Sequence, residues 1–308
     1  MPVLSANGIR IAYDSSGDPH AVPMLLIMGL GMQLVSWPDE FVDGLAEAGF
    51  YVIRFDNRDS GLSTKFDAAG APSLPLAYLK HLLHWPLRSA YTLDDMADDA
   101  LGLMSALGIG KAHIVGVSMG GMIAQLIAAR HPERVLSLTS IMSSSGRRGL
   151  PGPTRAARAA LMARPADPGN PDSVIEHGLR VLRAIGSPAY PTPDKLLRER
   201  VARALKRSVC PAGVARQMVA IAASGERSAL LARITARTLV IHGAADPLVP
   251  LACGQDTARR IPDARLEVIE GMGHDLPPQL IERLIALIDA HAHGKMNPNS
   301  TARLFENQ

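Results

Sequence analysis

Short apolar runs alternate along the chain with segments whose apolar residues recur at helical spacing. An apolar run with hardly any polar residue is typical of a strand buried on both faces of a parallel sheet. Such runs, and a hairpin around an Asn-Gly pair, predict strands over 3–5, 9–13, 24–28, 51–55, 114–117, 135–141, 238–242 and 266–269. Strands that alternate with helices indicate an α/β fold, with a mostly parallel central sheet and helices on both faces.

Helical spacing is clearest in two segments. Thr92 and Asp95 form a capping-box-like start to a helix that runs to Gly108, and an amphipathic helix covers 277–291. Residues 65–91 show little periodicity, so we expect a loop there with at most one short helix.

The alternation of strands and helices breaks between residues 146 and 233. This segment is rich in Ala, Arg and Pro, and prolines separate its helical patches. We therefore expect a core made of 1–145 and 234–292, with a helical cap inserted over 146–233. Residues 293–308 have no pattern and are expected to be a disordered tail.

One predicted strand runs into the sequence GVSMG at 116–120, which a helical pattern follows. A strand, a sharp turn with serine at its apex and a helix make up a nucleophile elbow, in which the glycines leave room for the adjoining backbone. The pattern alone is common enough to occur by chance. Because a strand and a helix frame it here, it favours Ser118 as a nucleophile.

A serine nucleophile needs a base, and the base needs an orienting acid. With an elbow of this kind, the chain order is serine, acid, histidine. Asp246 and His274 each follow a predicted strand, at the end of the sheet where open α/β folds place their chemistry. His242 lies inside a strand, where a core imidazole is the better interpretation. We therefore expect His274 as the base and Asp246 as its partner.

The oxyanion of an acyl-transfer intermediate needs preorganised donors. We expect one from the backbone N–H of Met119, directly after the serine. The second is expected from Leu30, in the loop Gly29-Leu30-Gly31 after a predicted strand. A plain glycine turn is the alternative interpretation of that loop.

The polar loop at 56–59 holds Asp, Asn, Arg and Asp directly after a predicted strand. Paired carboxylates can carry acid–base chemistry, but polar residues in a turn more often form a local hydrogen-bond and ion-pair network, which we expect here. The densest basic group lies on a predicted helix at 198–207, and we expect it to face solvent rather than a polyanion.

Composition narrows the class of partner. The 308 residues are 47% hydrophobic and carry a net charge of +3 from scattered basic residues, which favours neither nucleic acid nor a membrane surface as a partner. Glycine-rich phosphate loops and metal-ligand spacing are lacking, so we expect no cofactor and no metal. Cys210 and Cys253 make no disulfide framework and the N-terminus has no secretory pattern, so we expect a cytoplasmic protein. The oligomeric state is open, a homodimer included.

These motifs resemble the α/β-hydrolase superfamily over about residues 3–292. Four segments are also similar to its aclacinomycin methylesterase-like carboxylesterase branch: residues 28–41, 53–63, 115–120 and 262–274. Met28 departs from the superfamily, in which many members have a histidine before the oxyanion glycine. The cap segment matches the branch poorly, so an anthracycline substrate is not implied for this chain.

The resemblance implies an α/β-hydrolase fold with a helical cap and a carboxylesterase with a triad of Ser118, Asp246 and His274. Its substrate would be a small ester. Members of this superfamily with the same triad also cleave C–C bonds or form peracids, so these two activities are open alternatives. Haloalkane dehalogenases and epoxide hydrolases use a carboxylate nucleophile, against which Ser118 argues. A non-catalytic receptor that binds a small ligand under the cap is an alternative of another class.

Overall fold

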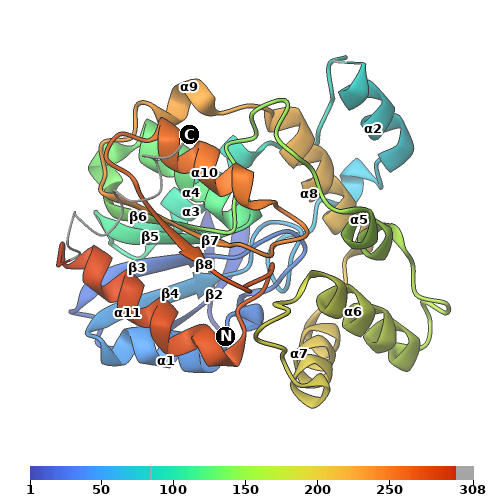
Figure 1. Ribbon diagram of the computed structural model, residues 1–308, viewed down its shortest axis with the longest axis horizontal. Helices are drawn as coiled ribbons and strands as arrows, with labels where there is room; N and C mark the ends of the chain where they lie inside the picture. The colour runs from blue at the N-terminus through green and yellow to red at the C-terminus, as the bar shows by residue number, and fades with distance from the viewer. Residues whose placement is uncertain (84, 296–308) are drawn as a thin grey trace.

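An eight-stranded sheet runs through the centre of the computed structural model, which describes residues 1–83 and 85–295 (Figure 1). Its strand order is β1-β2-β4-β3-β5-β6-β7-β8. The strands are β1 (Val3–Ala6), β2 (Ile9–Ser16), β3 (Val22–Ile27), β4 (Phe50–Phe55), β5 (Ala112–Val117), β6 (Val135–Ile141), β7 (Thr238–Gly243) and β8 (Arg265–Ile269). Only the pairings of β2 with β1 and β4 are antiparallel among these. The predicted mostly parallel sheet is confirmed.

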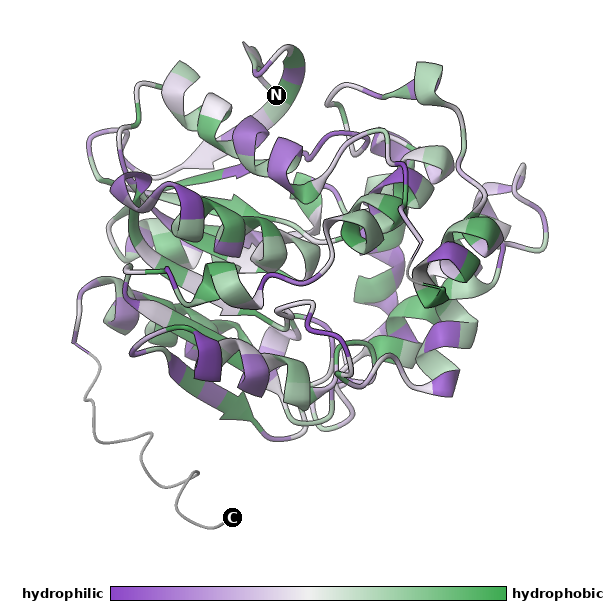
Figure 2. Ribbon diagram, turned by 90° about the horizontal axis from the view of Figure 1, so that it is seen from above, coloured by the Kyte–Doolittle hydropathy of each residue, from purple (hydrophilic) through white to green (hydrophobic). Residues whose placement is uncertain are grey.

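Helices cover both faces of the sheet (Figure 1). One face carries α1 (Asp39–Glu47) and α11 (Ile281–Ala292), and the other carries α3 (Leu93–Ala106), α4 (Met119–Arg130) and α10 (Leu251–Arg260). Each face has its own large cluster of buried apolar side chains, which explains why the strands are apolar on both sides. Figure 2 shows these apolar strands enclosed between the two helical layers.

The helix starting at Thr92 has the expected capping box, with Thr92 and Asp95 satisfying each other's backbone N–H groups. Helix α10, in contrast, has no counterpart among the helices that the apolar pattern predicts. It buries mainly small or polar side chains, among them Cys253, Gly254 and Thr257, so it has no apolar stripe that the sequence could reveal.

Five helices fill the segment between β6 and β7, and its described residues contain no strand. They are α5 (Arg155–Met162), α6 (Pro171–Ile185), α7 (Asp194–Arg207), α8 (Pro211–Ser224) and α9 (Ser228–Leu231). The predicted helical character of 146–233 is thus confirmed, while its separate domain status stays a prediction. The short helix expected within 65–91 is α2 (Leu74–Leu82), which contacts α8.

The carboxyl ends of the central strands lie in register. Ile27 on β3 is opposite Gly116 on β5, and Val117 is opposite Ile141 on β6. The loops that follow these strands therefore begin side by side, at the edge of the sheet that α5 to α8 adjoin in Figure 1.

The C-terminal tail and the length of the helices complete the description of the chain. Of the disordered tail expected over 293–308, residues 293–295 are described and their N–H groups bond back to the end of α11, while 296–308 lie outside the described residues. Within the described part of the chain, no helix has the length and apolar character that crossing a bilayer requires.

Candidate active site

Ser118 stands at the turn between β5 and α4 with φ 55° and ψ −118°. Non-glycine residues rarely take such a conformation, and it persists only where the surroundings enforce it. A Cβ at Gly120 would overlap the carbonyl oxygen of Ile27, and one at Gly116 would overlap the backbone of Gly120. Both glycines are needed for space, because the helix starts pressed against β3 and β5. The strand, turn and helix predicted around Ser118 are confirmed.

The structure brings the three predicted triad side chains together. His274 Nε2 lies 3.0 Å from Ser118 Oγ, and His274 Nδ1 lies 2.7 Å from Asp246 Oδ2. A carboxylate can only accept, so Nδ1 carries the proton and Nε2 can accept from the serine hydroxyl. The side chains come from the ends of β5, β7 and β8, as their sequence positions predicted. Their function as a catalytic triad stays a prediction.

Asp246 is held by the loop that follows it. Its Oδ1 accepts the backbone N–H groups of Leu248 at 2.9 Å and Val249 at 2.8 Å. His242 supports the same loop, because its Nε2 lies 2.7 Å from the carbonyl oxygen of Val249. Burial lowers the pKa of His242, so its neutral ring donates this hydrogen bond.

His242 is fully buried in β7, as expected of a core imidazole. Its Nε2 also lies 3.7 Å from Asp246 Oδ2, and its Nδ1 has no hydrogen-bond partner among the described residues. A positioning function next to the acid was not predicted. The available signal was the four-residue spacing between His242 and Asp246 at the end of one strand.

The segment between α6 and α7 holds the loop that carries His274. Ser187 Oγ accepts the N–H of Gly273 at 2.8 Å and donates to a carboxylate oxygen of Asp275, so it binds the residues on both sides of the histidine. The N–H of His274 itself donates to the carbonyl oxygen of Ile185 at 2.7 Å. Burial raises the pKa of Asp275. Sequence reasoning did not identify Ser187, which lies in a Pro-rich stretch without a motif.

The loop that contains the expected oxyanion donor touches the nucleophile. A Cβ at Gly29 would lie 3.2 Å from Ser118 Cβ and 3.7 Å from its Oγ. Neither the N–H of Leu30 nor that of Met119 donates to another group within residues 1–83 and 85–295. Both amides are therefore free to donate to a ligand beside Ser118. That they do so stays a prediction.

The polar loop at 56–59 forms the expected hydrogen-bond and ion-pair network. Asp56 Oδ1 accepts the N–H of Leu34 at 2.8 Å, and Asp56 Oδ2 pairs with Arg207 at 2.6 Å. Asn57 Nδ2 donates to the carbonyl oxygen of Met28 at 2.9 Å. The network thus fixes the chain on both sides of the glycine loop.

The second half of that loop forms buried ion pairs. Arg58 pairs with Asp99 at 2.6 Å, and Asp59 pairs with Arg216 of α8 at 2.7 Å. Burial acts to raise the pKa of Asp59, but hydrogen bonds from Arg216 and other donors lower it below its usual value. Asp59 is therefore a buried anion with a buried cationic partner.

The expectation that the basic group at 198–207 faces solvent is wrong for Arg207. Arg203 pairs with Asp39 at 2.6 Å, but its side chain is 45% exposed, as expected. The Arg207 side chain is only 11% exposed and reaches buried Asp56. The physical reason is that α7 packs on the segment after β3, where Gln33 also donates to its C-terminal carbonyl groups.

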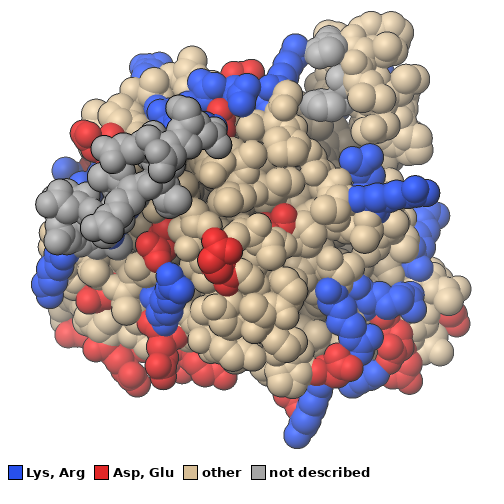
Figure 3. Space-filling model, viewed as in Figure 1, with Lys and Arg blue, Asp and Glu red and all other residues tan. Residues whose placement is uncertain are grey.

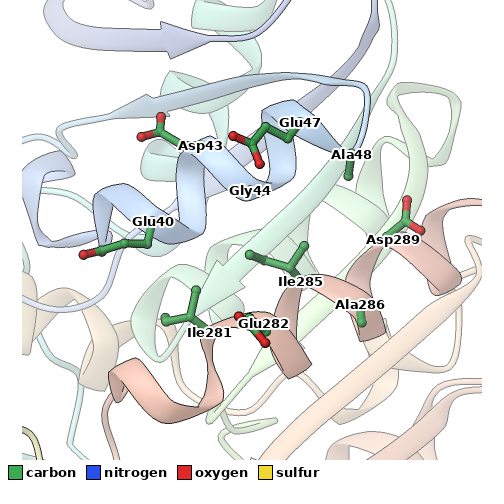
Figure 4. A pocket seen from close by; sticks show the side chains of 10 residues that line it. All are labelled: Glu40, Asp43, Gly44, Glu47, Ala48, Ile281, Glu282, Ile285, Ala286 and Asp289. Atoms are coloured by element: carbon green, nitrogen blue, oxygen red, sulfur yellow. The ribbon is translucent and has the colours of Figure 1, made fainter.

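A hollow of about 540 Å³ lies elsewhere, between α1 and α11 (Figure 4). Its lining holds five carboxylates and no serine, cysteine or histidine, so it offers no nucleophile. Figure 3 shows acidic side chains along the lower edge of the molecule. Among the described residues, no group of three or more His, Cys, Asp and Glu is placed to hold a metal ion.

Comparison with known proteins agrees with this fold. Residues 22–278 match the alpha/beta hydrolase fold family. The chain is 32% identical to rhodomycin D methylesterase DauP of a Streptomyces species, over 94% of this chain and 97% of that protein. It is 28% identical to a 2-hydroxy-6-oxononadienedioate/2-hydroxy-6-oxononatrienedioate hydrolase of Burkholderia vietnamiensis, over 86% of this chain and 85% of that protein.

A solved structure with similar architecture is the meta-cleavage product hydrolase CumD from Pseudomonas fluorescens. It has a TM-score of 0.74 and 22% identity, and the match covers 96% of this chain and 98% of that one. The sequence relatives bear out the expected enzyme class, a carboxylic ester hydrolase. By the match over residues 22–278 and the identity along nearly the whole length, the chain belongs to the α/β-hydrolase family.

Proposed function

We propose that this hydrolase is a serine esterase that cleaves a small carboxylic ester through an acyl-enzyme. The observation that carries the proposal is the hydrogen-bonded chain from Ser118 through His274 to Asp246, with distances of 3.0 and 2.7 Å. In this arrangement an imidazole can take the serine proton as the hydroxyl attacks, and a carboxylate can stabilise the resulting imidazolium.

In the acylation step, Ser118 Oγ attacks the ester carbonyl carbon and its proton moves to His274 Nε2. The carbonyl oxygen becomes an oxyanion, which accepts hydrogen bonds from the N–H groups of Leu30 and Met119. When the C–O bond to the alcohol breaks, His274 gives its proton to the leaving oxygen. Asp246 accepts from His274 Nδ1 throughout and keeps the ring in one orientation.

In the deacylation step, a water molecule attacks the acyl carbon while His274 takes one of its protons. The second tetrahedral intermediate uses the same two amide donors. Its collapse breaks the bond to Ser118 Oγ, which recovers a proton from His274, and the carboxylic acid leaves.

A methyl ester is the first substrate class to test, because a relative at 32% identity is named a methylesterase. The relative named an oxononadienedioate hydrolase favours a second candidate, hydrolysis of a vinylogous diketone on the same residues. We place the reaction in the cytoplasm, and the free thiols Cys210 and Cys253 support this location.

The test is Ser118→Ala, assayed on p-nitrophenyl esters of increasing chain length and on a panel of methyl esters. We expect kcat to fall by about 10⁴-fold or more, because the nucleophile is gone. A fluorophosphonate should label the wild type stoichiometrically and the variant not at all, whereas a receptor with an idle triad need not react. Near-wild-type turnover by Ser118→Ala would refute the proposal. Diketone and peroxide assays run alongside would detect the two alternative activities.

A further inference from the structure

Gln217 of helix α8 links the segment above the site to the glycine loop beside Ser118. Its side chain is 0% exposed. The Oε1 atom accepts the N–H of Gly31 at 2.8 Å, while Nε2 donates to the carbonyl oxygen of Arg58 at 2.8 Å and to Ser60 Oγ at 3.1 Å. One side chain therefore joins α8, the glycine loop and the polar loop at 56–59.

The orientation of the Gln217 amide is fixed by its partners. The N–H of Gly31 can only donate and the carbonyl oxygen of Arg58 can only accept, so a flipped amide would lose both hydrogen bonds. A buried polar group left without a partner destabilises the folded chain. The side chain thus holds both loops in one arrangement.

Gly31 lies in a tight turn formed by residues 29–32, and its backbone conformation defines that turn. Its φ is +67°, and the N–H of Met32 closes the turn on the carbonyl oxygen of Gly29 at 3.2 Å. A glycine with positive φ in the third position is what a type II turn requires. A Cβ at Gly31 would also lie 3.0 Å from Val214, one turn before Gln217 on α8. Helix α8 therefore supports the turn by both packing and hydrogen bonding.

Leu30 lies between two fixed neighbours in this turn. Gly29 is pressed against Ser118, and Gly31 is tied to Gln217. An oxyanion donor is effective only at hydrogen-bond distance from the developing charge, and a displacement of about 1 Å can cost about 100-fold in rate.

We propose that Gln217 is a positioning residue that sets the Leu30 amide for the oxyanion, so that α8 contributes to the rate of ester cleavage as well as to the cover of the site. The inference rests on the proposed esterase function. Its effect should appear in the tetrahedral state, where the donor is used, and not in binding of the ground-state ester.

The first experiment compares Gln217→Met with the matched control Val219→Ala. Methionine has a similar length and removes the amide, whereas Val219 is buried on the same helix two residues away and points to a different side. We expect Gln217→Met to lower kcat about 10- to 100-fold with KM changed less than about threefold. Its affinity for an arylboronic acid, which forms a tetrahedral adduct with serine, should fall in parallel. Val219→Ala should keep wild-type kcat and boronate affinity.

Equal effects of the two variants on kcat, or a wild-type kcat in Gln217→Met, would overturn the inference. Wild-type enzyme that cleaves no ester would instead sink the proposed function, so the two failures are distinguishable. Thermal unfolding of each variant shows whether it is folded.

If Gln217→Met does not fold, Gln217→Glu tests the proposed positioning function instead. Burial raises the pKa of the introduced carboxyl, and the protonated acid can still accept from Gly31 and donate to Arg58. The rate relative to wild type at the same pH should therefore be near one in acid and fall as the pH rises. A ratio that stays near one at every pH would contradict the inference, since the carboxylate form cannot donate.

Discussion

Four of the five helices between β6 and β7 form two pairs that differ in how they meet the rest of the molecule. Helices α7 and α8, the cap base, place Arg207 and Arg216 against core carboxylates that are 0% exposed. Helices α5 and α6, the cap edge, contact each other, and α6 forms exposed ion pairs with α7, such as Arg183 with Asp194. A buried pair costs far more to break than an exposed one. The ion pairs that join the cap base to the core are therefore harder to break than those between the cap edge and α7.

The largest expected effect comes from breaking the pair of Asp59 and Arg216, whose side chains are 0% and 2% exposed. Arg216→Met leaves a buried carboxylate without its cation and should lower the free energy of unfolding by about 3 to 5 kcal/mol in urea titration. Asp59→Asn combined with Arg216→Met should recover part of the loss, since no uncompensated charge stays buried. A loss below about 1 kcal/mol would show that the cap base is not anchored by this pair.

Acid should weaken the core before it affects the cap base. Burial lowers the pKa of His113 on β5 and of His291 on α11 from 6.5 to about 4. The unfolded chain therefore binds more protons between these values, and stability falls as the pH drops from about 6.5 towards 4, by on the order of 3 kcal/mol for each group. The lowered pKa of Asp59 acts only at more acid pH.

Urea titrations across this pH range test the order of events. His291→Gln should flatten the fall in unfolding free energy, because one of the buried imidazoles with a lowered pKa is gone. An equally steep fall in that variant would assign the acid sensitivity to other groups.

The smallest effect is expected at the cap edge. Arg183→Ala removes the pair with Asp194, whose side chains are 46% and 68% exposed, and should leave the unfolding free energy close to that of the wild type. Ester turnover should also stay close to wild type. A loss of unfolding free energy as large as that of Arg216→Met would show that the cap base and the cap edge do not differ in this respect.

Sequence alone was sufficient for the sheet, because the buried strands are short segments rich in apolar residues, such as Val22–Ile27 and Ala112–Val117. It was also sufficient to place Ser118, Asp246 and His274 at strand ends, since each belongs to a short motif in a known chain order. Helix α10 was not predicted, because it buries small and polar residues instead of an apolar stripe.

The supporting contacts could not be predicted in the same way. Gln217 meets Gly31 across 186 positions of the chain, and Ser187 meets Gly273 across 86. Hydrogen bonds of this kind depend on tertiary placement and leave no local period. The one available signal was the adjacent Arg216 and Gln217 within the apolar stretch of α8, where polar side chains must find buried partners.

The positive φ of Ser118 matters when variants of this protein are selected for thermal stability. The apex of the turn is the position at which the fold gives up stability for chemistry, because glycine would adopt the same backbone without strain. Selection for thermal resistance alone would therefore favour loss of the nucleophile. Screens of this enzyme need to score turnover and stability together.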